Sequence, residues 1–140
     1  MLRSFLVAVL FLFSSAAFAA GGEHADAEKK AVTAAKAWLA MVDNGDYAAS
    51  WAASATPMKT AVTLEDWDRA MKGVRAPLGA MLVRKLATAT YATTLPGAPD
   101  GQYVVITFKT RFANKKAAVE TVTPMIDTDG TWHVSGYFIR

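Results

Sequence analysis

The stretch Tyr103-Val104-Val105-Ile106-Thr107-Phe108 decides the fold class, because it is the clearest β-strand in the sequence. Its residues are mostly β-branched or aromatic, and such residues fit the pleated surface of a sheet. We expect the strand to continue to about Phe112. A turn cluster rich in Pro, Gly and Asp precedes it at residues 96–101, and Asn114-Lys115 forms a turn after it. The sheet is therefore expected to be built from strands joined by short turns.

Three further strands are predicted around this one, at residues 82–95, 117–126 and 132–139. Each is rich in Val, Thr, Tyr or Ile, and the last two are separated by the turn Asp127-Thr128-Asp129-Gly130. Consecutive strands with short connections pair in antiparallel fashion. Four antiparallel strands in chain order are expected.

Helices are predicted before the strands. Apolar residues recur at helical spacing from Asp26 to Val42, and Asn44-Gly45 ends that pattern. Asp46 is expected to cap a short second helix, and Pro57 to break the pattern that follows. Thr63-Leu64-Glu65-Asp66 resembles a capping box that begins another helix. The fold class is therefore α+β, with N-terminal helices packed on one face of a curved four-stranded antiparallel sheet.

One face of this sheet is expected to be apolar and covered by the helices. Strict alternation along the strands assigns the apolar face. Core packing is the expected role of the tryptophans, and a pocket lined by them is the alternative. The sheet residues assigned to the apolar face are Val104, Ile106, Phe108, Val119, Trp132, Val134 and Phe138, facing Trp38, Leu39 and Trp67 of the helices.

The first residues predict export. Arg3 is followed by an apolar run from Phe5 to Phe13 and then by Ala17-Phe18-Ala19. A short basic start, an apolar core and small residues in an A-x-A pattern are typical of a cleaved signal peptide. The run is shorter than the ~20 residues of a membrane-spanning helix. We therefore expect a signal peptide at 1–19, one α+β domain at 20–140, and a periplasmic or secreted location without a membrane anchor after cleavage.

Composition excludes several classes of function. The chain has no cysteine, so thiol catalysis, thiolate metal sites and disulfides are excluded. It has 15 basic and 12 acidic residues and a net charge of +3, without a basic block, so no nucleic-acid partner is expected. Nucleotide-binding loops and a nucleophile elbow are also absent from the sequence. No cofactor is expected.

Two histidines do not predict a metal site. His24 lies in a flexible lead-in and His133 in the last strand, whereas a zinc site needs three or four converging ligands. Ser135, His133 and a carboxylate are the residue types of a catalytic triad, but no sequence motif indicates that they form one. Asp127-Thr128-Asp129-Gly130 is interpreted as a turn, because a calcium loop requires a later glutamate and flanking helices.

One polar cluster is predicted from strand register. If Asn114-Lys115 is a two-residue hairpin, Lys109 faces Glu120, and if residues 127–130 form a four-residue loop, Glu120 faces Tyr137. Lys109, Glu120 and Tyr137 would then form a row on the sheet face opposite the apolar one. We interpret this row as an exposed cross-strand pair that helps to fix register, rather than as a catalytic site.

Several segments together resemble an exported bacterial family called domain of unknown function 4019. The resemblance covers nearly all of the chain after the signal peptide and implies a fold related to nuclear transport factor 2, a cone of helices and bent sheet. That fold hosts ketosteroid-isomerase-like enzymes, dehydratases and many ligand-binding or dimerising modules, so it does not select a function. The segments that carry it are Ala37-Trp38-Leu39, Gly45-Asp46-Tyr47, Ser50-Trp51, Arg75-Ala76-Pro77-Leu78-Gly79, residues 95–103, Phe112-Ala113-Asn114-Lys115, Glu120-Thr121-Val122 and Gly136-Tyr137-Phe138.

Two functions remain open from the sequence. We favour a non-catalytic periplasmic binding or interaction module, with a small apolar ligand or a second copy of the chain as candidate partners, because no catalytic constellation is found. The alternative is a small-pocket isomerase or lyase that uses Glu120 or another acid with Tyr137 or Tyr103. A carboxylate and a tyrosine that point into a closed apolar pocket would favour the enzyme.

The signal-peptide hypothesis predicts cleavage between Ala19 and Ala20. Intact-mass measurement of protein purified from the periplasm should give the mass of residues 20–140, because Ala17 and Ala19 occupy the two small-residue positions before the cut. A mass that retains residues 1–19 would show instead that the segment is an anchor.

Overall fold

The computed structural model describes residues 22–140, so the predicted signal peptide and its Ala19–Ala20 cleavage site lie outside the described residues. Helix α1 (Ala25–Asp43) is followed by α2 (Tyr47–Ala53), α3 (Thr56–Ala61), α4 (Leu64–Val74) and the 3-10 turn η1 (Ala76–Leu78). The strands are β1 (Met81–Ala92), β2 (Tyr103–Phe112), β3 (Lys115–Ile126) and β4 (Trp132–Ile139). They form one antiparallel sheet in the order β1-β2-β3-β4. The predicted α+β class is confirmed.

Local signals explain where the helices begin. The Asp46 side chain accepts a hydrogen bond from the Ala49 amide, and Thr63 accepts one from the Asp66 amide, so both predicted caps are confirmed. Helix α3 was not predicted, because Pro57 was interpreted as a break. The proline instead occupies the first turn of α3, where its fixed φ suits a helix and its missing N–H has no helical partner to lose.

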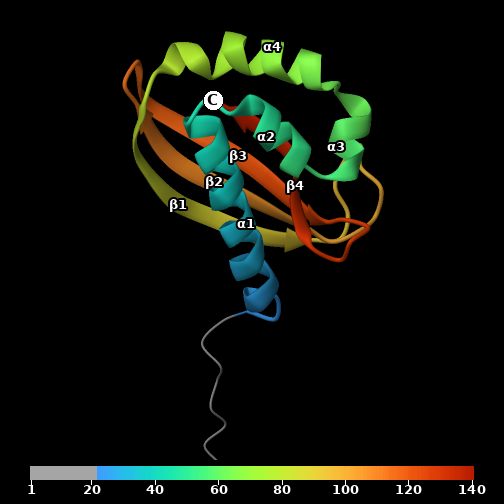
Figure 1. Ribbon diagram of the computed structural model, residues 1–140. Coiled ribbons are helices and arrows are strands. Elements are labelled where there is room, and N and C mark those ends of the chain that lie inside the picture. Colours follow the sequence, from blue (N-terminus) through green and yellow to red (C-terminus); the bar gives the residue numbers. More distant parts are fainter. Residues whose placement is uncertain (1–21) are drawn as a thin grey trace, which may run out of the picture.

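The helices cover one face of the sheet. Figure 1 shows α1 lying across that face, with α2, α3 and α4 arching over the same side, and α1 contacts all four strands. The core between the layers contains Ala31, Ala35, Trp38, Leu39 and Val42 from α1, Trp67 and Met71 from α4, and Val104, Ile106, Phe108, Val122 and Val134 from the sheet.

Two residues were assigned to the wrong sheet face. Val119 lines a concavity on the outer face, and Phe138 is 53% exposed. Val119 was misassigned because the β2–β3 register differs by one residue from the predicted one, so that Val119 and not Glu120 pairs with Lys109. Phe138 was misassigned because the pairing of β3 with β4 contains a β-bulge between Thr123 and Pro124, which interrupts the alternation along β4. After the bulge, the odd-numbered residues of β4 point inward, so Tyr137 faces the helices and Phe138 faces away.

The hairpin between β2 and β3 is shifted from its predicted register. Phe112 pairs with Lys115, so the connecting residues are Ala113 and Asn114. Asn114 is fixed there because its side chain donates to the Pro77 carbonyl at 3.0 Å and its amide to the Leu78 carbonyl at 2.9 Å. Gly79 permits this docking, since it has a φ of +75° and an added Cβ would lie 3.1 Å from the Ala113 Cβ.

Phe108→Ala should lower the free energy of unfolding by about 3–5 kcal/mol, because Phe108 is fully buried under the helices and its removal leaves a cavity. Denaturant unfolding measures this loss. The matched control is Phe138→Ala on the outer face, which should change stability by less than about 1 kcal/mol. Equal losses for the two variants would contradict the assignment of the faces.

Candidate functional site

The inner sheet face holds a fully buried carboxylate, Glu120 on the interior strand β3. Its Oε1 accepts hydrogen bonds from Arg84 Nε at 2.7 Å and from Thr110 Oγ1 at 2.5 Å. Its Oε2 accepts from Arg84 Nη2 at 3.1 Å and from the Tyr137 hydroxyl. A carboxylate has about four lone-pair sites. Four donors therefore use the acceptor capacity of Glu120.

Arg84 on β1 connects this carboxylate to helix α1. Its Nη1 donates to Asp43 Oδ2 at 2.7 Å and its Nη2 to Asp43 Oδ1 at 2.9 Å, so one guanidinium serves two carboxylates. Burial alone would lower the pKa of Arg84, but the hydrogen bonds to Asp43 and Glu120 outweigh that effect and raise the pKa. Arg84 therefore remains cationic and joins the last residue of α1 to the middle of the sheet.

A second arginine completes the charge balance. Arg75 Nη2 donates to Asp43 Oδ1 at 3.1 Å, and Arg75 Nη1 donates to the Gly79 carbonyl at 2.7 Å. Its guanidinium lies 4.4 Å from the centre of the Phe112 ring, a cation–π contact, while its buried Nε has no hydrogen-bond partner in the structure. The two arginines balance Asp43 and Glu120, so the buried cluster is neutral as a whole. We call Asp43, Arg75, Arg84, Glu120, Thr110 and Tyr137 the charge cluster.

Tyr137 closes the charge cluster on the β4 side. Burial, followed by the neighbouring charge of Glu120, raises the pKa of Tyr137, so its hydroxyl stays protonated and donates its single proton to Glu120. The ring packs edge-on against Trp38 with centroids 5.1 Å apart. Trp38 is held in turn by hydrogen bonds from its Nε1 to the Ser50 carbonyl and to Ser54. The cluster is thus continuous with the aromatic packing under α2.

This geometry limits the chemistry of the cluster. A general base needs a lone pair directed at the proton that it removes, and an oxyanion donor needs a free O–H. The lone-pair sites of Glu120 are occupied, and the Tyr137 proton is directed at Glu120. In the arrangement seen, the charge cluster fastens α1 and η1 to the sheet and presents no free acid, base or nucleophile.

The predicted row of Lys109, Glu120 and Tyr137 is only partly assembled. Glu120 and Tyr137 do contact each other, but on the inner face, and the prediction that Glu120 is exposed is wrong. Lys109 pairs with Val119 and points to the outer face. The β2–β3 register differs by one residue from the predicted one, which moves Lys109 to the opposite face from Glu120. The β3–β4 register differs by two residues, one from a longer turn and one from the bulge, which keeps Glu120 and Tyr137 together.

Sequence reasoning missed the partners of Glu120, although one signal was present. Arg84 and Lys85 are adjacent in a strand, and adjacent strand residues point to opposite faces. One of these two cations therefore had to point toward the helices, where it needs a carboxylate. Asp43 and Arg75 carried no comparable signal, because they end helices at positions where a charged residue is usually solvated.

The histidines and tryptophans form no second site. His133 contacts Asp129, but Ser135 donates its hydroxyl proton to the Thr123 carbonyl at 2.8 Å, so no triad is assembled. His24 stacks on Tyr91, with centroids 3.8 Å apart. Within residues 22–140, no group of three potential metal ligands converges. Trp38 and Trp132 line a surface hollow of about 180 Å³, which is below the usual size of a ligand pocket, ~300–1,000 Å³.

Comparison with known proteins identifies the family without adding an activity. Residues 34–137 match the family described as protein of unknown function DUF4019, and the chain belongs to that family. All six residues of the charge cluster lie within the matched range. No curated protein and no solved structure matches the chain. No helix in the described part of the chain is long and apolar enough to span a membrane.

Arg84→Met should destabilise the fold by about 3–5 kcal/mol, because it leaves Glu120 buried without a cation. The double variant Arg84→Met/Glu120→Gln should be more stable than Arg84→Met alone, since the orphaned charge is removed as well. Denaturant unfolding of both single variants and the double variant measures this coupling. The control is Lys85→Met, the next residue of the strand, which should change stability by less than about 0.5 kcal/mol. Additive losses at Arg84 and Glu120 would contradict the ion pair.

His133 predicts a pH dependence of stability. Its Nδ1 lies 2.9 Å from the Ala53 carbonyl and its Nε2 lies 2.7 Å from Asp129 Oδ2, so the doubly protonated ring can donate to both. The hydrogen bond to Ala53, followed by that to Asp129, raises the pKa of His133. The protonated His133 therefore contributes its full stabilisation of the fold below its pKa in the unfolded chain, about 6.5. This stabilisation is lost as the pH rises through the higher pKa of His133 in the folded protein.

The stability difference between the wild type and His133→Gln should accordingly be larger at pH about 6 than at pH about 9, when both are unfolded in urea. Asp129→Asn should reduce the difference, because it removes one of the two acceptors. A difference that is constant over this interval would show that His133 does not titrate in contact with Asp129.

Proposed function

We propose that this DUF4019 domain is a non-catalytic binding or interaction module that acts after export, and that it has the architecture of the nuclear transport factor 2-like fold. The single observation that carries the non-catalytic part is the saturation of Glu120, the buried carboxylate that an isomerase or lyase would use as its base. The other parts of the proposal depend on the arrangement of the helices and on the first residues of the sequence.

Catalysis by this carboxylate would require a different arrangement. A ketosteroid-isomerase-like reaction needs a free carboxylate and a separate hydroxyl or acid that stabilises the enolate. Here Tyr137 donates to the carboxylate itself, and Arg84 neutralises it. Substrate would have to separate Arg84 from Glu120, which leaves a buried charge unpaired at a cost of several kcal/mol. A structural role requires no such step.

The arrangement of the elements supports the fold proposal at a coarser level. N-terminal helices lie over one face of an open antiparallel sheet that curves around them, as expected for a cone of this kind (Figure 1). Export is supported by the basic start, the apolar run and the Ala17-Phe18-Ala19 pattern. A periplasmic module with a structural core would bind its partner through its surface.

The isomerase or lyase alternative retains one supporting observation. Glu120 and Tyr137 are in contact on the face that lies under the helices, which is where fold relatives of this type enclose their pockets. A small movement of α1 would take Asp43 away from Arg84 and loosen the charge cluster. The alternative therefore predicts base chemistry that depends on Glu120.

Proton exchange at ketones separates the two functions. A panel of small ketones is incubated with the purified domain in deuterium oxide, and loss of the α-proton signals is followed by nuclear magnetic resonance. We expect exchange no faster than in buffer, because Glu120 has no free lone pair. Accelerated exchange that disappears in a folded Glu120→Gln variant would overturn the non-catalytic proposal.

A binding module should also be stabilised by its ligand. A thermal-shift screen against periplasmic metabolites, phospholipids and peptides tests this, since a ligand at about one hundred times its Kd adds about 2.7 kcal/mol to the folded state. The recovered ligand should be chemically unchanged when its mass is measured. Conversion of a ligand to a product would favour the enzyme.

A further inference from the structure

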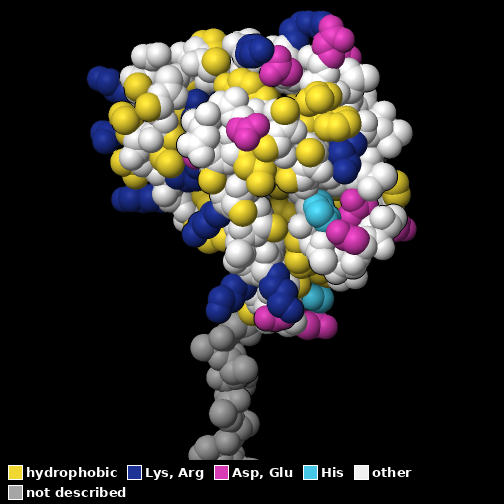
Figure 2. All heavy atoms as spheres, viewed as in Figure 1, with side chains coloured by type: hydrophobic (Ala, Val, Ile, Leu, Met, Phe, Trp, Pro, Cys, Tyr) yellow, Lys and Arg dark blue, Asp and Glu magenta, His cyan; other side chains and the backbone are white. Residues whose placement is uncertain are grey.

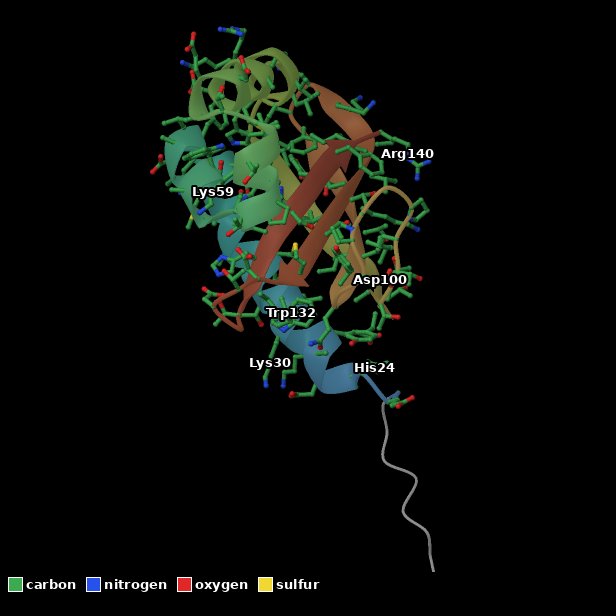
Figure 3. The ribbon with its side chains drawn as sticks, turned by 90° about the vertical axis from the view of Figure 1, so that its right-hand side faces the viewer. His24, Lys30, Lys59, Asp100, Trp132 and Arg140 are labelled. Carbon is green, nitrogen blue, oxygen red and sulfur yellow. The ribbon has the colours of Figure 1, made fainter. Side chains whose placement is uncertain are left out.

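The sheet face that points away from the helices carries a basic concavity. Figure 3 shows Arg140 extending on the side of the sheet opposite the helices, and Figure 2 shows basic side chains gathered at the left edge of the molecule beside hydrophobic ones. The concavity has a volume of about 780 Å³ and lies over the end of the sheet where β1 begins. Its charged lining residues are Lys85, Lys109, Arg111, Lys116 and Arg140, which we call the basic face.

Strand register brings these cations side by side. Lys85 pairs directly with Lys109, Lys109 with Val119, and Val119 with Arg140 through two backbone hydrogen bonds of 2.9 Å. This row crosses β1, β2 and β3 and ends at the residue that follows β4. Arg111 pairs with Val83 in the next row on the same face. Because neighbouring strands lie about 4.8 Å apart, the row is about 14 Å wide.

The cations of the basic face take part in no ion pair within the described part of the chain. Like charges directly opposite each other on adjacent strands are destabilising. The fold therefore keeps the Lys85–Lys109 pair at a cost to its stability, although the inner face pairs both of its buried carboxylates with arginines. An anionic group from outside the domain would remove this repulsion.

The surface between the cations is apolar. Val83, Ala117 and Val119 form the floor of the concavity, and Phe138, which is 53% exposed, lies on the same face in the row next to Arg140. A partner that fills the concavity therefore needs acidic groups at its edges and apolar groups at its centre. Exposed aromatic and apolar anchors surrounded by charged residues are typical of protein interfaces.

Size and shape select a polypeptide among the anionic partners. A single phosphate or carboxylate can contact two or three cations, but not a row about 14 Å wide. Apolar residues and cations line the concavity together, so a partner that fills it needs apolar groups beside its acidic ones. An extended chain of about four or five residues matches the width and can alternate acidic and apolar side chains.

We propose that the basic face binds an acidic, partly apolar polypeptide segment of a partner protein. This inference rests on the proposed function as a binding module and names the partner chemistry. The carboxylates of the segment contact Lys85, Lys109 and Arg140, while its apolar side chains cover Val119 and Val83. Salt screens such contacts, so the affinity depends on ionic strength.

The test uses the exported domain and a fluorescent peptide of alternating glutamate and leucine, about twelve residues long, so that it exceeds the width of the row. Fluorescence anisotropy should show saturable binding that weakens as salt rises from about 0.05 to about 0.3 M. Peptides that alternate glutamine or lysine with leucine should not bind. The variant Lys85→Gln/Lys109→Gln should bind the acidic peptide at least about tenfold more weakly, a loss of about 1.4 kcal/mol.

Two further measurements keep the result interpretable. The control Lys29→Gln/Lys36→Gln removes the same charge from the exposed side of α1 and should bind the peptide as the wild type does. The melting temperature of Lys85→Gln/Lys109→Gln should equal or exceed that of the wild type, because repulsion is relieved. A weaker affinity in a folded variant then reports on the basic face and not on unfolding.

Three outcomes would overturn the inference. These are failure of the acidic peptide to bind, equal loss of affinity in the α1 control, and binding of the basic face to phosphatidylglycerol vesicles without binding to the peptide. None of these outcomes contradicts the proposal that the domain is a binding module, provided that another ligand in the thermal-shift screen stabilises the wild type and Lys85→Gln/Lys109→Gln alike. Turnover that depends on Glu120 would instead contradict the proposed function itself.

Discussion

The structure depends on the burial of one negative charge, the carboxylate of Glu120. A carboxylate without exposure to water must be neutralised and must fill its lone pairs, or the fold that contains it is unstable. Arg84 neutralises the carboxylate and supplies two of its four hydrogen bonds, and Thr110 and Tyr137 supply the other two. Asp43 holds the same guanidinium from the end of α1. This requirement fixes how the end of α1 lies against β1 and β3. The position of η1 follows, because Arg75 connects it to the same Asp43.

Over the residues that the structure describes, charged side chains are paired on the inner face of the sheet and unpaired on the outer face. On the inner face, two arginines and two carboxylates are enclosed and matched. On the outer face, five cations surround a small apolar floor, and the described ion pairs include none of them. The paired charges lie on the inner face, where water is excluded, and they stabilise the fold. The unpaired cations lie on the outer face, where solvent and partners have access. The residues that stabilise the fold are therefore separate from the residues that are available for binding.

Secondary structure and fold class could be predicted from the sequence because their causes are local. Asp46 and Thr63 cap helices through hydrogen bonds to residues three positions ahead, and Val104, Ile106 and Phe108 alternate as a half-buried strand does. The charge cluster could not be predicted, because it depends on register, and register here is set by the docking of Asn114 on η1 and by a bulge in β4. Neither cause is visible in the strand pattern, and one residue of slip was enough to move Lys109 to the opposite face from Glu120.

The spacing of the cluster along the chain has a consequence for the order of folding. Thr110 and Glu120 are ten residues apart and meet when the β2–β3 hairpin closes, whereas Arg84 lies 36 residues from Glu120 and 41 from Asp43. Contacts between distant residues form late, since long loops must close first. We expect the hairpin to form while its carboxylate is still hydrated. We therefore expect water to leave Glu120 only when Arg84 arrives, which makes dehydration of this carboxylate a late event in folding.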